Sequence, residues 1–425
     1  MKKNLLLTIL TFFTCIFYSN SQRLLVLNEG ALDFSTGQII EPVSLGAYSL
    51  TTKSYTKLFE INGSRFASDL HLDGNTYWIA ADDKILRYNI KTDQKISELK
   101  SVGVRRIMTH QDLLIVSRGE YLVQLNSYVQ VYDKNTLELK YELLSSDFPY
   151  TTENIIVHEN KAYIIGNNGF DFGNEIGKIL VIDLNTLTLE KTIDLGPEAK
   201  NPENLIRYKD HLYTLNNRNF ISGSTVSKIN LNDGQVISTT LLPNVTSLCG
   251  TSVLVESSIL YQESGKNETG QYNLENDAAG FYKTAGSSYY GLSYDARSEL
   301  IVGGETDFFS FGKVYLMDRD LKVIDEFTSG ISPGYFAFDY SVSNQNETSA
   351  GTTKILEYNI SQNLLQINPQ LNVNAVNCIS TKGVNYSFNV HQSSVDISKL
   401  LPGIYTINVN YQGRMLSERF VKLGQ

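Results

Sequence analysis

The chain has 425 residues, of which 36 are basic and 45 acidic, so its formal net charge at pH 7 is −9. An acidic surface gains nothing from a phosphate backbone or an anionic membrane, so nucleic acid is excluded as the expected partner. With only three cysteines the chain carries no disulfide framework, and its fold must rest on a hydrophobic core.

Residues 1–21 have the composition of a secretory signal peptide. Two lysines form the positive end, an apolar run extends from Leu5 to Phe17, and small residues precede the expected cleavage before Gln22. A lipoprotein signal with Cys15 as the acceptor is the alternative, although the apolar run continues beyond that cysteine. Both interpretations predict export of the chain.

A short phrase recurs seven times after the signal: a large apolar residue, then Asn, Asp or Ser, then a polar turn. The anchor residues lie 40, 44, 50, 47, 43 and 45 residues apart. They are Tyr48, Tyr88, Tyr132, Ile182, Ile229, Tyr272 and Met317. A period in the forties built from short strands is typical of propeller blades. The sequence therefore predicts an all-β fold, with a seven-bladed β-propeller over residues 22–340.

Each repeat divides into four short strands separated by turn residues. In the fourth repeat the strands are expected at 153–158, 161–165, 178–183 and 188–195. The first strands of the seven repeats are expected to begin near Phe66, Val104, Glu153, Glu203, Ser247, Tyr290 and Tyr335.

The two ends of the repeat region predict how the ring closes. The chain opens on a second strand, Arg23 to Leu27, and the repeats end on a first strand, Gly334 to Tyr340. We expect these segments to pair in one blade, because pairing removes two exposed strand edges. A chain that lacks Arg23 to Leu27 is expected to misfold.

Residues 341–353 are polar and form a predicted linker, after which alternating segments return in residues 354–425. A small C-terminal β-sandwich is the predicted fold of this last part. Its run Val395-Asp-Ile-Ser-Lys-Leu-Leu-Pro-Gly-Ile-Tyr-Thr-Ile-Asn-Val, followed by Gly413 and Glu418-Arg-Phe-Val-Lys-Leu, resembles the C-terminal sorting domain of the type IX secretion system of Bacteroidetes. The resemblance implies that the type IX machinery recognises this domain, so that the protein is secreted or held at the outer-membrane surface. An ordinary immunoglobulin-like accessory domain is the alternative.

The repeat region carries the step Val-Ile-Asp-Leu-Asn-Thr-Leu at 181–187, a weaker copy at 131–137, and the opening Pro202-Glu-Asn-Leu. In these features it resembles the YncE-like surface propellers of Bacteroidetes, within the broad class of YVTN and quinoprotein-like propellers. Some of these relatives are similar to surface proteins that capture corrinoids for an outer-membrane transporter. The resemblance therefore implies cofactor capture, with such a transporter as a candidate partner.

Five long loops are expected on one face of the propeller, together with the connections between blades. The loops cover residues 28–42, 117–128, 166–177, 216–227 and 303–312. Aromatic, amide and guanidinium groups on one rim suit a flat, polar ligand that is stacked and hydrogen-bonded at its edges. The predicted ligand-binding residues are Arg105, Arg106, Tyr150, Asn167, Asn168, Phe170, Phe172, Asn217, Arg218, Phe220, Tyr289, Tyr290, Phe308 and Phe309. The alternative is that these loops fold over the ring and bury their own Phe side chains.

No metal site is predicted. His71, His110 and His158 recur near the ends of successive first strands, and equivalent positions of separate blades lie apart around a ring. Acidic residues at Asp82-Asp83 and in the 171–175 loop lack the ligand spacing of a known calcium loop.

No catalytic residue is predicted either. Glu153-Asn154 and Glu203-Asn204 open two first strands near the inner channel, and as repeats of one position they are interpreted as strand caps or bonds to neighbouring blades. The sequence contains no Gly-x-Ser-x-Gly elbow, phosphate loop or Cys-His pair.

The predicted function is that of a secreted or cell-surface binding protein. It captures a small nutrient or cofactor of the corrinoid kind, or a surface glycan, on the long-loop face. The first alternative is a quinoprotein-like, lyase or hydrolase enzyme, which needs convergent titratable residues with perturbed pKa values at the channel mouth. The second is a surface-layer or adhesion protein without a small ligand. No particular cofactor is assigned.

Overall fold

The computed structural model describes residues 22–219, 221–247, 251–341, 356–357, 364–368, 373, 375–380, 384–391, 393–401, 403–411 and 414–422. Every regular element in these ranges is a β-strand, so the prediction of an all-β protein is confirmed. Within the same ranges no helix is long and apolar enough to cross a membrane. The predicted signal peptide, Phe220 and nearly all of the predicted linker lie outside the described residues.

The chain divides into two compact units, Met1–Asn344 and Gln345–Gln425. The division falls inside the segment 341–353 that the sequence marks as a linker.

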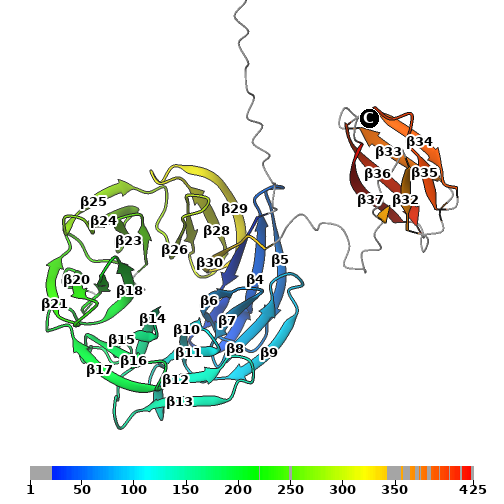
Figure 1. Ribbon diagram of the computed structural model, residues 1–425. Coiled ribbons are helices and arrows are strands. Elements are labelled where there is room, and N and C mark those ends of the chain that lie inside the picture. Colours follow the sequence, from blue (N-terminus) through cyan, green and yellow to red (C-terminus); the bar gives the residue numbers. More distant parts are fainter. Residues whose placement is uncertain are drawn as a thin grey trace, which may run out of the picture. The chain divides into compact units, whose positions relative to one another are not determined.

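Seven four-stranded antiparallel sheets lie between Arg23 and Asp339 in the described part of the first unit, and Figure 1 shows them arranged in a ring. Six of the sheets take four consecutive strands each. In chain order these strands are β6 (Ala67–Asp73), β7 (Thr76–Ala81), β8 (Lys84–Asn89) and β9 (Lys95–Lys100); β10 (Val104–His110), β11 (Leu113–Arg118), β12 (Ser127–Asp133) and β13 (Leu139–Leu144); β14 (Thr152–His158), β15 (Lys161–Gly166), β16 (Lys178–Asp183) and β17 (Thr188–Asp194); β18 (Pro202–Tyr208), β19 (His211–Asn216), β20 (Thr225–Asn230) and β21 (Val236–Leu241); β22 (Ser252–Val255), β23 (Ser258–Gln262), β24 (Glu268–Asn273) and β25 (Ala278–Thr284); β26 (Gly291–Asp295), β27 (Leu300–Glu305), β28 (Phe311–Met317) and β29 (Val323–Ile331).

The remaining sheet of the ring joins the two ends of the repeat region. Its order is β30-β1-β4-β5, from the strands β30 (Pro333–Asp339), β1 (Arg23–Asn28), β4 (Val43–Ser49) and β5 (Ser54–Ile61). Strand β1 pairs antiparallel with β30 along its whole length, from Arg23 opposite Asp339 to Asn28 opposite Pro333. The predicted pairing of the first and last strands is therefore confirmed. A short hairpin of β2 (Ala31–Asp33) and β3 (Gln38–Glu41) extends the loop between β1 and β4.

The hydrophobic core lies between neighbouring sheets. Second strands are buried over nearly their full length, as in β7, whereas fourth strands such as β9 are partly or fully exposed throughout. One cluster joins Ile115 of β11 to Ile164 of β15 and Leu180 of β16, so side chains of two sheets interlock. Burial on both faces explains why the second strands are continuous apolar runs.

The recurring phrase forms the turn between the third and fourth strands of each sheet. In the fourth repeat the Asp183 Oδ1 atom accepts hydrogen bonds from the backbone N–H groups of Asn185, at 2.8 Å, and Thr186, at 3.1 Å. Leu187 then adopts a positive φ of 54°. An Asp or Asn side chain that bonds to the backbone two and three residues ahead fixes such a turn, which explains why these residues recur.

One predicted strand start differs from the structure. The first strand expected near Ser247 begins at Ser252. Nearby, Thr246 pairs with Glu263 through an isolated bridge, and residues 248–250 lie outside the described part of the chain.

In the second unit the described residues form two sheets. The first has the order β31-β32-β35, from β31 (Leu356–Glu357), β32 (Leu364–Ile367) and β35 (Ser394–Asp396). The other has the order β34-β33-β36-β37, from β34 (Asn385–Asn389), β33 (Ala375–Ser380), β36 (Gly403–Tyr411) and β37 (Arg414–Lys422). One hydrophobic cluster includes Leu365 of the first sheet and Cys378 and Ile407 of the second, so the two sheets share a core.

Candidate functional site

The first strands of successive sheets contact one another around the centre of the ring, and we call them the inner strands. Five inner strands break their pairing register within their first residues, between Ala67 and Asp69, Val104 and Arg106, Thr152 and Ile155, Pro202 and Asn204, and Pro333 and Tyr335. A β-bulge adds an unpaired residue and changes the direction of the side chains beside it. Adjacent residues at these starts can therefore face the same side.

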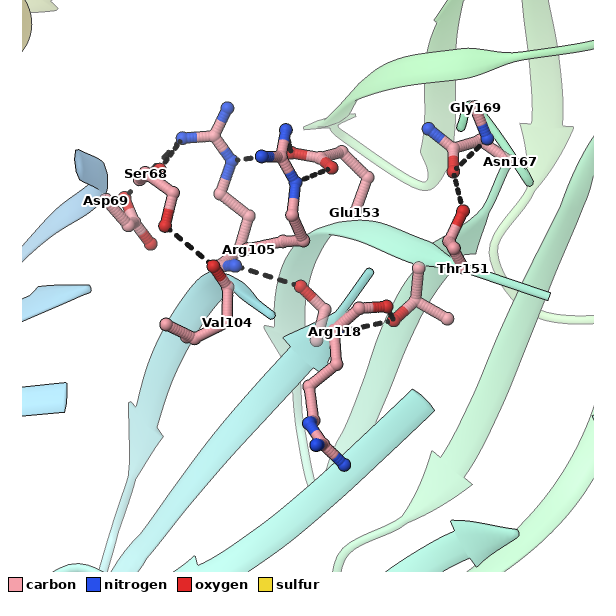
Figure 2. A network of polar contacts seen from close by, with 12 residues as sticks. Ser68, Asp69, Val104, Arg105, Arg118, Thr151, Glu153, Asn167 and Gly169 are labelled. Carbon is pink, nitrogen blue, oxygen red and sulfur yellow. Dashed lines mark hydrogen bonds and ion pairs between the residues drawn. The ribbon is translucent and has the colours of Figure 1, made fainter. Parts of the chain in front are cut away.

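Arg105 and Arg106 show the effect, because both guanidinium groups reach the carboxylate of Glu153 on the next inner strand. Arg105 Nε donates to Glu153 Oε2 at 2.8 Å, and Arg106 Nε lies 3.3 Å from Glu153 Oε1. Figure 2 shows Arg105 beside Glu153. The Glu153 side chain is 5% exposed and the Arg105 side chain 23%, so the pair is deep in the protein but within reach of water.

Arg106 also binds the preceding inner strand, β6. Its Nη1 atom donates to the carbonyl of Ser68 at 2.6 Å and lies 3.8 Å from Asp69 Oδ1. The other oxygen of Asp69 accepts the backbone N–H of Ile107 at 2.9 Å. Burial raises the pKa of Asp69, while Arg106 and this hydrogen bond oppose the rise. Arg106 thus ties three neighbouring sheets together.

Glu29 reaches the same place from the connection after β1. Its Oε1 atom accepts the hydroxyl hydrogen of Tyr290 at 2.6 Å, and Arg105 and Arg106 act on it electrostatically. Burial outweighs these interactions and raises the pKa of Glu29 to about 7. A carboxyl group with this pKa exchanges its proton near neutral pH.

Glu203, at the bulge of β18, has no direct partner. Within the described residues no hydrogen bond or ion pair involves its side chain, whereas Asn204 beside it donates to the carbonyl of Ser252 at 3.2 Å. Burial, and then the charge of Glu153, raise the pKa of Glu203, and Arg105 and Arg106 only partly offset the rise. We call Glu29, Asp69, Arg105, Arg106, Glu153 and Glu203 the central cluster.

Aromatic rings flank this cluster. The Arg105 guanidinium lies 5.1 Å from the ring centroid of Phe170, and the Arg106 guanidinium lies 5.1 Å from that of Tyr335. The Tyr290 ring meets Phe308 edge-on at 5.2 Å. Burial by itself lowers the pKa of each guanidinium. Neighbouring acidic groups raise this pKa by more than burial lowers it, so both arginines remain cationic.

The structure therefore brings together five of the predicted binding residues: Arg105, Arg106, Phe170, Tyr290 and Phe308. Phe172 and Phe309 lie on the same loops and are 65% and 81% exposed. With Phe308 51% exposed, the alternative that the loops bury their own Phe side chains is wrong for these three residues.

Tyr289 requires a correction, because it was expected on the rim and lies in the core. It is 2% exposed, its hydroxyl lies 3.0 Å from the sulfur of Met317, and its ring packs against Tyr315. Adjacent Tyr290 points to Glu29 instead. Only one of the two neighbouring tyrosines therefore faces the cluster.

The predicted amides also need correction, because they hold their own loops. Asn167 Oδ1 accepts from Thr151 and from the N–H of Gly169, at 3.2 Å each, and Figure 2 shows this arrangement. Asn168 Nδ2 donates to the carbonyl of Asn174 at 3.0 Å. Both residues are buried, so their polar atoms are used inside the protein.

Three other predicted residues also take part in scaffold contacts. Asn217 is buried and its Nδ2 atom donates to the carbonyl of Ser247 at 3.2 Å. Arg218 pairs with Glu198 at 2.7 Å. Tyr150 packs edge-on against Phe148 at 5.3 Å.

Two of the three recurring histidines contact the following sheet. His71 Nε2 lies 2.9 Å from Thr109 Oγ1 and His110 Nε2 lies 3.0 Å from Asn160 Oδ1, each on the following sheet. Among the residues that the structure describes, no group of three or more His, Cys, Asp or Glu side chains is placed to hold a metal ion.

The sequence did not single out Glu29, Asp69 or Tyr335, and it treated Glu203 as scaffold. The scaffold interpretation is confirmed for Glu153 and Asn204, which bond to neighbouring sheets, but Glu203 has no such bond in the described chain. The sequence did contain a signal for these functional residues. The side chain at the bulged position differs from one sheet to the next, as Arg105 and Glu203 show. A position kept only for the scaffold has no need of such variety.

Comparison with known proteins supports the fold. No protein-family model and no curated protein matches the chain. Among solved structures, hydrazine synthase from Kuenenia stuttgartiensis is similar with a TM-score of 0.50 and 14% identity, over 65% of this chain and 92% of that chain. BamB from Moraxella catarrhalis gives a TM-score of 0.46 at 12% identity, over 73% and 91% of the two chains. A chain of a mitotic checkpoint complex is similar with a TM-score of 0.47 and 9% identity, over 65% of this chain and 82% of that chain.

The similarity to the hydrazine synthase structure agrees with the ring of antiparallel four-stranded sheets. The chain contains a β-propeller.

Proposed function

We propose that this protein is a binding module, and that it captures a small polar ligand at the central cluster. The observation that carries the proposal is the convergence of Arg105, Arg106, Glu153 and Glu203, at the starts of inner strands, with Glu29 from the connection after β1. Assembling charged groups away from water costs free energy, which a purely structural role does not repay. Such groups concentrate at functional sites.

The loops beside the cluster support capture rather than a closed core. Phe172, Phe308 and Phe309 expose more than half of their surface on the face where the inner strands begin. Exposed aromatic side chains near convergent polar groups suit a ligand that is partly flat and partly polar. A corrinoid-like cofactor and a surface glycan both meet that description.

The proposed setting is the outside of a bacterial cell. In this view the ring is a seven-bladed YncE-like propeller, the second unit is a β-sandwich sorting domain of type IX secretion, and residues 1–21 direct export. The seven four-stranded sheets and the two-sheet second unit are compatible with this organisation. An outer-membrane transporter that receives the captured ligand is the proposed partner.

A thermal-shift screen of the purified full chain tests capture. Corrinoids, haem, glycans and small organic cations are added one at a time, because a ligand that binds only the folded form raises its melting temperature. We expect one class to stabilise wild type and the Glu138→Gln variant equally, since the Glu138 side chain is 70% exposed on the opposite face. The same class should stabilise a Glu29→Gln/Glu203→Gln double variant less. No shift with any class would contradict capture.

A second candidate function is acid–base catalysis. The observation that favours it is the raised pKa of Glu29 and Glu203 in one cluster with Glu153 and two arginines, because carboxyl groups of raised pKa serve as general acids at neutral pH. The test is turnover of any glycan that the screen selects. If Glu203→Gln still binds the glycan but no longer cleaves it, the enzyme hypothesis is favoured. If the wild-type protein binds the glycan and leaves it intact, capture alone is favoured.

A further inference from the structure

The two faces of the ring differ in the apolar side chains that they expose. The connections between second and third strands all lie on the long-loop face, and five of the seven expose large apolar side chains. These are Phe34 and Ile40; Tyr121, Leu122 and Val123; Phe172; Ile221; and Phe308 and Phe309. The connections on the opposite face expose no large apolar side chain among the described residues. Exposed apolar side chains gathered on one face indicate a contact surface.

Four of these five loops share a second feature, because an acidic residue stands directly before an exposed aromatic residue. The pairs are Asp33-Phe34, Glu120-Tyr121, Asp171-Phe172 and Asp307-Phe308, and we call them the tip pairs. All four aromatic side chains are more than half exposed. The four pairs belong to four different sheets of the ring.

In two tip pairs the acidic side chain is fixed in the turn that presents the ring. The Ser35 hydroxyl donates to Asp33 Oδ1 at 2.6 Å, and the backbone N–H of Ser310 donates to Asp307 Oδ1 at 2.8 Å. Hydrogen bonds from these serines are the main reason that the pKa of both carboxyl groups falls to about 2. An ionised carboxylate therefore stands beside an exposed ring at neutral pH.

The charge beside each ring indicates which partner fits. A bilayer or an apolar protein interface would strip water from the carboxylates without replacing its hydrogen bonds, which costs free energy. A sugar suits both groups, because its C–H face packs on an aromatic ring and its hydroxyl groups donate to a carboxylate. The exposed neutral side chains of Ser35, Asn174 and Ser310 can bond further hydroxyl groups.

The distribution of the tip pairs favours a long ligand over a single sugar. The sheets that carry them follow one another around the ring in Figure 1, so each pair can hold a different segment of one chain. Contacts that are weak one by one become strong when a polymer makes several of them, because the later contacts form within one complex.

We propose that the tip pairs bind a neutral polysaccharide, whose sugar rings stack on the four exposed aromatic side chains and donate hydroxyl hydrogens to the carboxylates beside them. The proposal rests on the proposed role as a binding module and adds a surface that extends beyond the central cluster. Acidic polysaccharides do not belong to the ligand class, because the carboxylates of the tip pairs and the net charge of −9 repel them.

Affinity electrophoresis of the full chain tests the proposal. Native gels contain laminarin, mannan, galactomannan or amylopectin as neutral polymers, or alginate as an acidic one. We expect at least one neutral polymer to retard the protein, and alginate not to retard it. A disaccharide of the same sugar should bind at least about tenfold more weakly than the polymer, because it reaches only one tip pair.

Matched variants locate the polymer on the protein. Phe34→Ser/Tyr121→Ser removes two rings of the tip pairs and is expected to weaken polymer binding about tenfold. Phe281→Ser is the control, since Phe281 is 60% exposed on the fourth strand β25, and it should bind like wild type. All three side chains are exposed, so both variants are expected to fold. Asp33→Asn/Asp307→Asn keeps the turns and should weaken polymer binding about threefold.

Other partners for this face would give different results. If phosphatidylcholine vesicles bind instead of the polymers, and Asp33→Asn/Asp307→Asn strengthens that binding, the face docks on a membrane. If poly-lysine binds instead and about 0.5 M salt abolishes the binding, the face docks on a basic protein. Each of these results, or retardation by none of the neutral polymers, would overturn the proposal.

The same gels separate this proposal from capture at the central cluster. If Phe34→Ser/Tyr121→Ser binds the polymer like wild type and Glu29→Gln/Glu203→Gln does not, the glycan lies at the central cluster, so capture stands and the tip pairs are not its site. If a polymer is retained by the tip pairs but no ligand of the thermal-shift screen depends on the cluster, only capture at the cluster fails. If nothing binds in either experiment, both proposals fail.

Discussion

Glu29 is a carboxyl group in a place where its charge is costly. Burial raises its pKa from 4.5 to about 7, and the hydrogen bond from Tyr290 and the charges of Arg105 and Arg106 only limit the rise. Because the folded form binds this proton more tightly than the unfolded chain, Glu29 favours folding fully below about pH 4.5, and this contribution is lost as the pH rises through 7.

The Glu29→Gln variant tests this linkage. Glutamine accepts the same hydrogen bond without a charge, so the variant should match wild type near pH 4.5 and be more stable by roughly 2 kcal/mol at pH 8. Urea unfolding between pH 4.5 and 8 measures the difference, with Glu138→Gln as the control. A difference that does not change with pH would mean that Glu29 titrates normally in the folded protein.

Residues whose role is local were predictable from the sequence. Asp133, Asp183 and Asn230 each accept backbone N–H groups two residues ahead, and this turn chemistry repeats wherever the phrase repeats. Backbone hydrogen bonds accordingly lower the pKa of Asp133 and Asp183. The central cluster had no such signal, because its members lie far apart along the chain and meet only in the folded ring.

At the scale of elements, β1 closes the ring and Arg23 at its start anchors the closure. Arg23 Nε donates to Asp339 of β30 at 2.8 Å, and Nη1 donates to Asp93 at the end of the next sheet, also at 2.8 Å. The Arg23 side chain is 13% exposed and the Asp339 side chain is fully buried. One guanidinium therefore joins the first strand, the last strand and a neighbouring sheet.

Replacing Arg23 should weaken the closure. Arg23→Ala leaves the Asp339 carboxylate buried without its partner and is expected to cost about 3 kcal/mol of unfolding free energy. Arg23→Lys keeps the charge but loses the fork that spans two aspartates, so its cost should be smaller but measurable. Urea denaturation gives both values. An Arg23→Ala midpoint equal to that of wild type would show that closure does not depend on this residue.

The second strands and the closing pair were predicted well, because continuous apolar runs and the mismatch at the chain ends are properties of the sequence itself. The bulges at the starts of the inner strands were not predicted. Arg105-Arg106 reads as two residues on opposite faces of a strand, and only the register break after Val104 brings both guanidinium groups to Glu153. The structure of the site therefore depends on irregularities that alternation in the sequence conceals.

At the scale of the whole molecule, the long-loop face combines buried charge with exposed aromatic side chains. Phe172 is 65% exposed and Phe309 81%, whereas Phe148, which belongs to the core, is 4% exposed. The loops were predicted as the functional face from their length and composition. Which side chains are exposed on them depends on loop packing, which the sequence did not reveal for Asn167 or Asn217.

Substitutions distinguish the exposed loop side chains from the buried core side chains. Phe172→Ser and Phe309→Ser should change the free energy of unfolding by no more than about 0.5 kcal/mol, whereas Phe148→Ala should cost about 3–5 kcal/mol. The two Ser variants should nevertheless bind a captured ligand more weakly, because its apolar part loses a contact. Urea unfolding and ligand titration check the two effects. Stability losses like that of Phe148→Ala would mean that the loop side chains pack into the protein.

The most direct measurement of capture at the central cluster is the dissociation constant of the ligand that the screen selects, for wild type, the Glu29→Gln/Glu203→Gln double variant and Glu138→Gln. The cluster is predicted to supply the polar contacts, so the double variant should bind at least tenfold more weakly, and Glu138→Gln should bind like wild type. Equal dissociation constants for all three proteins would contradict a ligand site at the centre of the ring.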